Sequence, residues 1–144
     1  MVLVTDYFDR VLSLKRQISI AISRVDRCRD MTQKITVTLT ADVVSHSRNV
    51  TSNEEAIIRL VEAEDALKEL NRQYNDLIAM VYTDLSKLSD EICAKVLCYY
   101  YIDQMSFDKI AIKMHIAKTS VRRYHKQGLD EFQKVLNIAE EKAS

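Results

Sequence analysis

Residues that form tight turns are almost missing from this chain. Its 144 residues include no proline and one glycine, Gly128. The tight turns that join β-strands depend on glycine and proline, and loops that wrap phosphate groups depend on glycine. A mostly β fold, a Rossmann unit or a phosphate-binding loop is therefore close to excluded, and we expect an all-α protein.

The composition agrees with one ordinary helical domain or two very small ones. Hydrophobic residues make up 47% of the chain and charged residues 29%, which is enough apolar material for a core and too much for a wholly disordered chain. Basic and acidic residues balance at 21 each. The formal net charge is therefore zero, and any charged binding surface must come from a local concentration of one sign.

Location and metal content are also constrained. No stretch approaches the roughly 20 apolar residues of a membrane helix, and MVLVTDYFDR has no basic segment of the kind that opens a signal peptide. Cys28, Cys93 and Cys98 are odd in number and lack CxxC spacing, which favours reduced thiols in a cytoplasm. We expect a cytoplasmic protein without a metal or cofactor.

Two long amphipathic helices are predicted in the first 86 residues. Over residues 4–31 and again over residues 54–86, apolar side chains recur at alternating spacings of three and four, which places them on one stripe of each helix. The stripes contain Val4, Tyr7, Val11, Leu14, Ile18, Ala21, Val25 and Cys28, and then Leu60, Ala63, Leu67, Leu70, Tyr74, Leu77 and Val81. Matching stripes predict a coiled-coil-like antiparallel hairpin.

The hairpin prediction has two further consequences. Residues 32–53 are rich in threonine, serine and β-branched residues, so an irregular connection is expected there, and Ile35, Val37 and Leu39 alternate with threonine as in a short strand. Two helices alone bury little, so the stripes require a third partner. Homodimerisation through the hairpin is the leading expectation, and the C-terminal helices or a foreign protein are the alternatives.

The chain changes character near residue 86, so we expect a helical hairpin and oligomerisation region over 1–86 and a second domain over 87–144. Ser89 is a candidate N-cap for a helix over 90–102. Two further helices are predicted over 107–114 and 118–138, separated by HIAK.

The span FDKIAIKMHIAKTSVRRYHK, residues 107–126, has the spacing of a helix-turn-helix. Ala111 is the small residue that lets the second helix cross closely, and His115 lies at the bend. Val121 is the branched residue that anchors the second helix, while Ile110, Met114, Ile116 and Tyr124 occupy the remaining inward positions. This combination of positions is the reason for predicting that residues 87–144 form a domain that binds double-stranded DNA.

Charge supports this interpretation. Six basic residues and no acid occur between positions 109 and 126: Lys109, Lys113, Lys118, Arg122, Arg123 and Lys126. On the second helix, Lys118, Thr119, Arg122 and Lys126 share a face opposite Val121 and are expected to enter the major groove. The alternative is an ordinary solvated face that binds nothing.

Two other groups of residues have a structural interpretation. Tyr99, Tyr100 and Tyr101 form either a stacking platform for bases or, as we favour, a helix that packs in the core. His46, His115 and His125 are widely spaced and lack a carboxylate grouping, so we assign them no catalytic or metal role. With no paired carboxylates, no nucleophile beside a base and no phosphate loop, an enzyme is not expected.

Residues 88–132 resemble region 4 of bacterial sigma factors. The resemblance is carried by Leu88-Ser89-Asp90-Glu91, Tyr99-Tyr100-Tyr101, Lys109-Ile110-Ala111 and Ser120-Val121-Arg122-Arg123. Three positions depart from that pattern: His115 and Gln104 replace glycines, and Ala117 replaces the serine or threonine N-cap of the recognition helix. A left-handed backbone is expected at His115, and loss of the cap costs about 1 kcal/mol.

The whole chain is similar to the ArpU and RinA type of phage and prophage regulators, which join a coiled-coil front half to a sigma-like back half. This resemblance implies a transcriptional regulator that binds DNA in a Gram-positive host cell. It also implies a recognition helix in which the DNA-binding residues are Lys118, Thr119, Ser120, Arg122, Arg123 and Lys126.

Two alternatives remain open from the sequence. One is a small DNA-packaging subunit of the terminase type, which also joins a helix-turn-helix to an oligomerisation element and usually forms rings. The other is a sigma-like protein that docks on RNA polymerase without touching DNA. In that case the tyrosine run and the apolar hairpin stripe are the interface.

Overall fold

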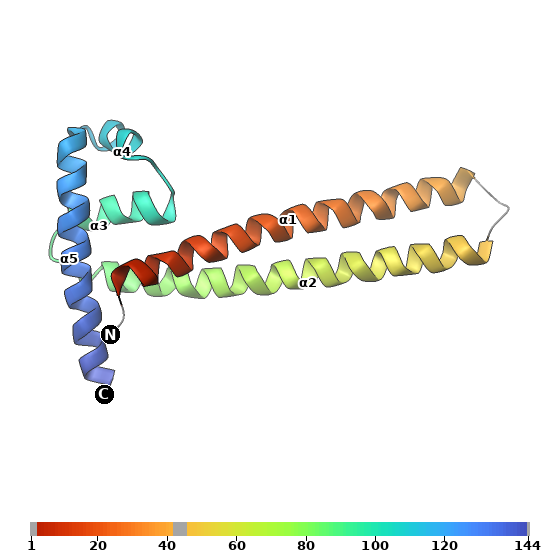
Figure 1. Ribbon diagram of the computed structural model, residues 1–144, viewed down its shortest axis with the longest axis horizontal. Helices are drawn as coiled ribbons and strands as arrows, with labels where there is room; N and C mark the ends of the chain where they lie inside the picture. Colours follow the sequence, from red (N-terminus) through yellow and green to blue (C-terminus); the bar gives the residue numbers. More distant parts are fainter. Residues whose placement is uncertain (1–2, 42–45, 144) are drawn as a thin grey trace. The chain divides into compact units, whose positions relative to one another are not determined.

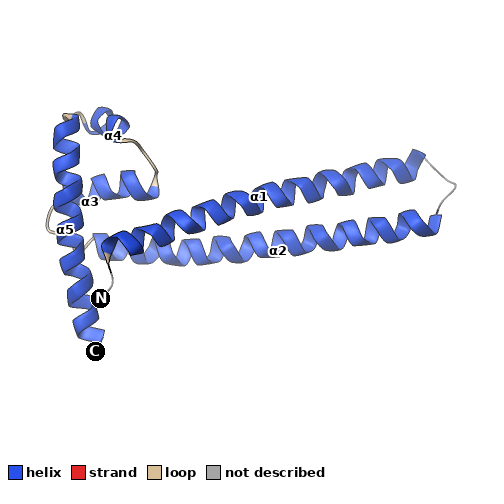
Figure 2. Ribbon diagram, in the orientation of Figure 1, coloured by secondary structure: helices blue, strands red, loops and turns tan. Residues whose placement is uncertain are grey.

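The computed structural model describes the backbone of residues 3–41 and 46–143 and the side chains of residues 3–35 and 52–143. Every secondary-structure element in these ranges is a helix, which confirms the all-α prediction for this part of the chain (Figures 1 and 2). The elements are α1 (Val4–Ala41), α2 (His46–Leu85), α3 (Glu91–Leu97), the one-turn π-helix η1 (Cys98–Ile102), α4 (Phe107–Met114) and α5 (Lys118–Ala143).

The chain divides into two compact units. The two-helix unit consists of residues 14–73, and the terminal unit consists of residues 1–13 together with 74–144. The terminal unit therefore takes in the beginning of α1 and the end of α2 in addition to the C-terminal helices. These units divide the chain at different places from the predicted regions 1–86 and 87–144.

In the two-helix unit, α1 and α2 run antiparallel. Arg29 forms an exposed ion pair with Glu64 at 3.5 Å, and the Thr32 hydroxyl lies 3.5 Å from the Ala56 carbonyl, so the contacts on α2 move backward as α1 moves forward. Val25, Ala56 and Ala63 are buried between the helices. Val25 and Ala63 lie on the stripes that the three-four spacing predicts, whereas Ala56 lies before the first residue of the second predicted stripe.

The prediction of an irregular connection over residues 32–53 is wrong for most of that segment. α1 continues to Ala41 and α2 begins at His46, while residues 42–45 lie outside the described residues. The short strand at residues 35–39 is also wrong, because that segment is part of α1. Helix propensities differ by less than about 1 kcal/mol per residue among non-proline, non-glycine types, so a threonine-rich segment is not excluded from a helix. Thr32 also satisfies its hydroxyl within the helix by donating to the Cys28 carbonyl at 2.9 Å.

The helix predicted over 90–102 is also interrupted. It begins at Glu91, and its N-cap is Asp90, not Ser89, because an Asp90 carboxylate oxygen accepts from the Ile92 N–H at 2.9 Å. The α-helical pattern gives way to the π-helix η1 after Leu97. The Asp103 N–H then donates to the Cys98 carbonyl at the end of η1.

Gly128 marks a close approach of α5 to α3. A Cβ atom at this position would lie 3.2 Å from the Leu97 side chain and 3.3 Å from the Cβ of Cys93. Leu97 and Cys93 are both fully buried. The single glycine of the chain therefore serves helix packing and not a turn, because its absent side chain lets the two helices cross closely.

The first turns of α1 belong to the core of the terminal unit. The Phe8 ring is 1% exposed and stacks on Tyr101 with a centroid distance of 4.1 Å, and Phe132 of α5 lies 5.3 Å from it. Tyr7 is buried beside Phe132, and its hydroxyl donates to an Asp84 carboxylate oxygen at 3.0 Å. Burial, together with this hydrogen bond, raises the pKa of Tyr7.

Candidate nucleic-acid interface

α4 and α5 meet at a tight, well-defined turn. Ser106 caps α4, since its hydroxyl accepts from the Lys109 N–H at 3.3 Å. α4 ends at His115, whose φ of 56° and ψ of 43° are left-handed, as the sequence predicts. The His115 N–H donates to the Ile112 carbonyl, and the Ile116 N–H donates to the Ala111 carbonyl. This hydrogen-bond pattern is a Schellman ending, and it turns the chain sharply before α5.

Apolar side chains hold the two helices together beneath this turn. Ile110 of α4, Val121 of α5 and Val96 of α3 form a fully buried cluster. The other predicted inward residues, Ala111, Met114, Ile116 and Tyr124, pack around it. The inward positions derived from the spacing therefore pack together beneath the turn, whereas the outward residues include several cations and the exposed Ile112 of α4.

Seven of the eight predicted DNA-binding residues are exposed. They are Lys109, Lys113, Lys118, Thr119, Arg122, Arg123 and Lys126, whereas Ser120 is half-buried. Thr119, Arg122 and Lys126 occur at spacings of three and four and share one face of α5. Lys113 turns elsewhere, because its Nζ lies 4.9 Å above the Tyr99 ring. The Arg123 guanidinium lies 5.1 Å from the Tyr124 ring.

One acid modifies this basic surface. An Asp108 carboxylate oxygen lies 3.0 Å from the Lys118 Nζ, and both side chains are substantially exposed. Asp108 is not among the eight residues predicted to bind DNA. The sequence does place Asp108 in the first turn of α4, where the helix dipole stabilises a carboxylate. Its contact with α5, however, depends on the turn between the two helices.

The tyrosine run is half-buried and packs against other parts of the protein. Tyr100 stacks on Phe107 at 4.9 Å, and Tyr101 stacks on Phe8. The Tyr101 hydroxyl is hydrogen-bonded to Nε2 of His125 at 3.0 Å. Burial lowers the pKa of His125 and raises the pKa of Tyr101 to about 12. These contacts support the packing interpretation of the run, because two of its three rings already stack on protein aromatics.

Other kinds of site are less well represented. Within residues 3–35 and 52–143, whose side chains the structure describes, no three histidine, cysteine, aspartate or glutamate residues are grouped as metal ligands are. None of the described helices is long and apolar enough to cross a membrane. The basic surface of α4 and α5 is therefore the candidate site that the described residues support best.

Comparison with known proteins gives no relative: no protein-family model, no curated protein and no solved structure matches this chain.

The left-handed His115 provides a test of the turn. A non-glycine residue in this conformation is strained by about 1–3 kcal/mol, and glycine removes that strain while making the unfolded chain more flexible. We expect His115→Gly to raise the free energy of unfolding by about 1 kcal/mol. Urea unfolding followed by circular dichroism measures this change. His115→Ala is the control, because alanine keeps the strain and brings no gain; equal stability of the two variants would contradict the left-handed turn.

Proposed function

We propose that this chain is a sequence-specific DNA-binding transcriptional regulator of the phage and prophage type that it resembles. In this proposal α4, the turn at His115 and α5 form a helix-turn-helix, and α5 is the recognition helix. The observation that carries the proposal is the Schellman turn joined to an exposed row of cations on α5, with Ile110 and Val121 buried beneath.

The chemistry of the row suits a major groove. Arg122 can donate two parallel hydrogen bonds to the O6 and N7 atoms of guanine, and Thr119 can reach a base edge or a phosphate. Lys118 and Lys126 are suited to phosphates, since an ammonium group acts as a point charge. Cation–phosphate contacts release counterions, so the affinity falls steeply as salt rises.

In this proposal the half-buried Ser120 does not recognise bases. Its position beside Val121 is turned partly toward the protein. Lys109 and Lys113 belong to α4, and Lys113 already lies over Tyr99. We therefore assign base recognition to Thr119 and Arg122. The lysine and arginine side chains around them are assigned contacts with the phosphate backbone of the DNA.

Two copies of a helix-turn-helix read two half-sites, so a hairpin formed by α1 and α2 fits as the element that joins two chains. Selection from a library of random duplexes with the full chain tests the proposal. Enrichment of a common, two-fold symmetric sequence is the expected result. Recovery of no common sequence would contradict it and would favour a packaging subunit or a protein that docks on RNA polymerase.

Asp108 gives a second test of the same face. Its carboxylate holds Lys118 and also repels phosphates, so Asp108→Asn should release the lysine and remove a negative charge. We expect the dissociation constant for the selected duplex to fall about fivefold at low salt, and the difference to shrink as salt is added. Fluorescence anisotropy with a labelled duplex measures both effects.

The matched control is Asp65→Asn, which removes an equal charge from an exposed position in the two-helix unit. A general effect of net charge would change both variants alike, whereas a local effect at α5 changes only Asp108→Asn. An unchanged dissociation constant for Asp108→Asn would exclude Lys118 from the DNA interface.

A further inference from the structure

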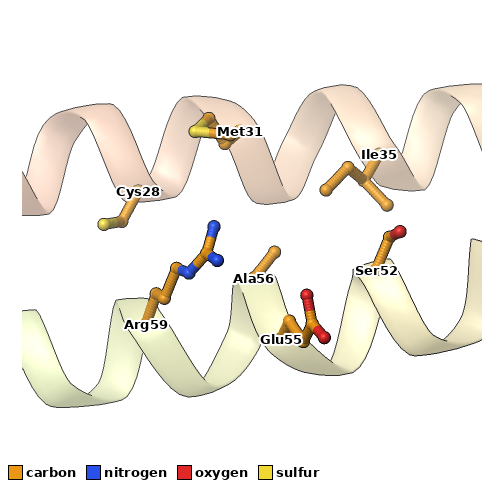
Figure 3. A pocket seen from close by; sticks show the side chains of 7 residues that line it. All are labelled: Cys28, Met31, Ile35, Ser52, Glu55, Ala56 and Arg59. Atoms are coloured by element: carbon orange, nitrogen blue, oxygen red, sulfur yellow. The ribbon is translucent and has the colours of Figure 1, made fainter.

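A groove lies between the helices of the two-helix unit. It has a volume of about 220 Å³ and is lined by Cys28, Met31 and Ile35 of α1 and by Ser52, Glu55, Ala56 and Arg59 of α2 (Figure 3). The space exists because the short side chains of Ser52 and Ala56 face α1. Met31 at its edge is 52% exposed.

Two stripes of opposite charge flank this groove. Each follows the four-three spacing that keeps residues on one side of a helix, and every member is exposed. The α1 stripe consists of Ile20, Arg24, Arg27, Met31 and Lys34, and the α2 stripe consists of Glu55, Arg59, Glu62, Ala66 and Glu69. The first stripe has three cations and no acid, and the second has three carboxylates and one cation.

We propose that this groove face, defined as the groove with its two stripes, binds a second copy of this chain in a four-helix bundle. A two-fold axis parallel to the helices brings the α1 stripe of each copy against the α2 stripe of the other. The two contacts are identical by symmetry. Each then sets two cations of one stripe against two carboxylates of the other, so the face is complementary to itself at these two levels.

The register within one chain supports the pairing. Arg29 pairs with Glu64, and Thr32 lies beside Ala56. Residues of α1 and α2 that lie at the same height along the hairpin therefore have residue numbers that add up to about ninety. Arg27 is then within one turn of the height of Glu62, and Lys34 within one turn of the height of Glu55. An axis parallel to the helices keeps these heights, so both pairs meet between copies.

The apolar members of the stripes explain why a second copy is favoured over solvent. Ile20 is 71% exposed and Met31 is 52% exposed in the single chain. In the bundle, Met31 of the second copy enters the groove beside Ala56, which removes both the side chain and the groove from water. This inference concerns the two-helix unit alone and holds whether or not α5 binds DNA.

Sedimentation equilibrium of the full chain tests the proposal. The parent is expected to have the mass of two chains at high concentration. Arg27→Glu places like charges opposite each other in both symmetric contacts, so it should raise the dissociation constant of the dimer about tenfold. Combining it with Glu62→Arg exchanges the two signs and should restore the parent value.

Lys68→Glu is the control, because it makes the same charge change on a different face of α2. A parent that stays at the mass of one chain would overturn the proposal and leave the groove to a foreign protein or a small apolar molecule. A larger ring, or a dimer that Arg27→Glu does not weaken, would also overturn it. Circular dichroism checks that each variant keeps its helices, and the duplex-library selection, run separately, tests the DNA-binding proposal.

Discussion

Replacing Lys118 and Arg122 together by alanine is expected to abolish the mobility shift of the selected duplex. Both side chains are exposed at the start of α5, and neither belongs to the buried cluster of Val96, Ile110 and Val121. A well-placed base contact and a phosphate contact each contribute about 1–3 kcal/mol. Their joint loss therefore weakens binding by about a hundredfold or more.

Three comparisons make this result specific. Lys68→Ala with Lys142→Ala removes the same charge from exposed positions elsewhere and should leave the shift intact. The single Lys118→Ala variant should weaken binding to all sequences and lower the slope of log affinity against log salt by about one. The single Arg122→Ala variant should relax the preference for one base. If the double variant binds as the parent does, α5 is not the recognition helix.

The second large effect is expected in the core of the terminal unit. Phe8→Ala removes a ring that is 1% exposed and is stacked on Tyr101 at 4.1 Å, with Phe132 at 5.3 Å. Truncating a buried phenylalanine to alanine leaves a cavity and costs about 3–5 kcal/mol. Urea unfolding should show this loss, and the near-ultraviolet circular dichroism of the tyrosines should weaken at the same time.

Leu3→Ala is the matched control, since Leu3 lies in the same segment but is 46% exposed and should cost less than about 0.5 kcal/mol. Phe8→Leu keeps most of the apolar volume and should fall between the two. Equal stability of Phe8→Ala and Leu3→Ala would show that the N-terminal segment does not pack against α5. The same packing predicts that residues 87–144 expressed alone lose much of their stability.

Local rules succeeded where one helix contains its own signal. The predicted range 107–114 for the first helix of the turn motif agrees with α4, and α5 begins at Lys118 as expected. His115 adopts the left-handed conformation that its place in the turn requires, and Gln104, also at a glycine position of the sigma-like pattern, has a φ of 55°. A backbone that must reverse within three residues has few solutions, so spacing alone identifies them.

Local rules failed where the outcome depended on more than the local sequence. The threonine-rich segment after residue 31 has weak helix propensity, yet α1 continues to Ala41. Asp108 and Lys118 are ten residues apart, and only the turn between their helices brings them to 3.0 Å. Phe8 and Tyr101 are further apart still, and no periodicity within either helix signals that their rings stack.

The amino-acid sequence by itself determined the helical class, the inward positions between residues 110 and 124, and the concentration of cations between positions 109 and 126. These depend on the scarcity of turn residues and on the helical repeat, which are local properties of the chain. Tertiary structure alone decided that the first turns of α1 complete the C-terminal core, that Gly128 serves a helix crossing, and that a groove separates a basic from an acidic stripe. Those features depend on which helices meet and at what height, and the free energy of that choice comes from burial summed over distant residues.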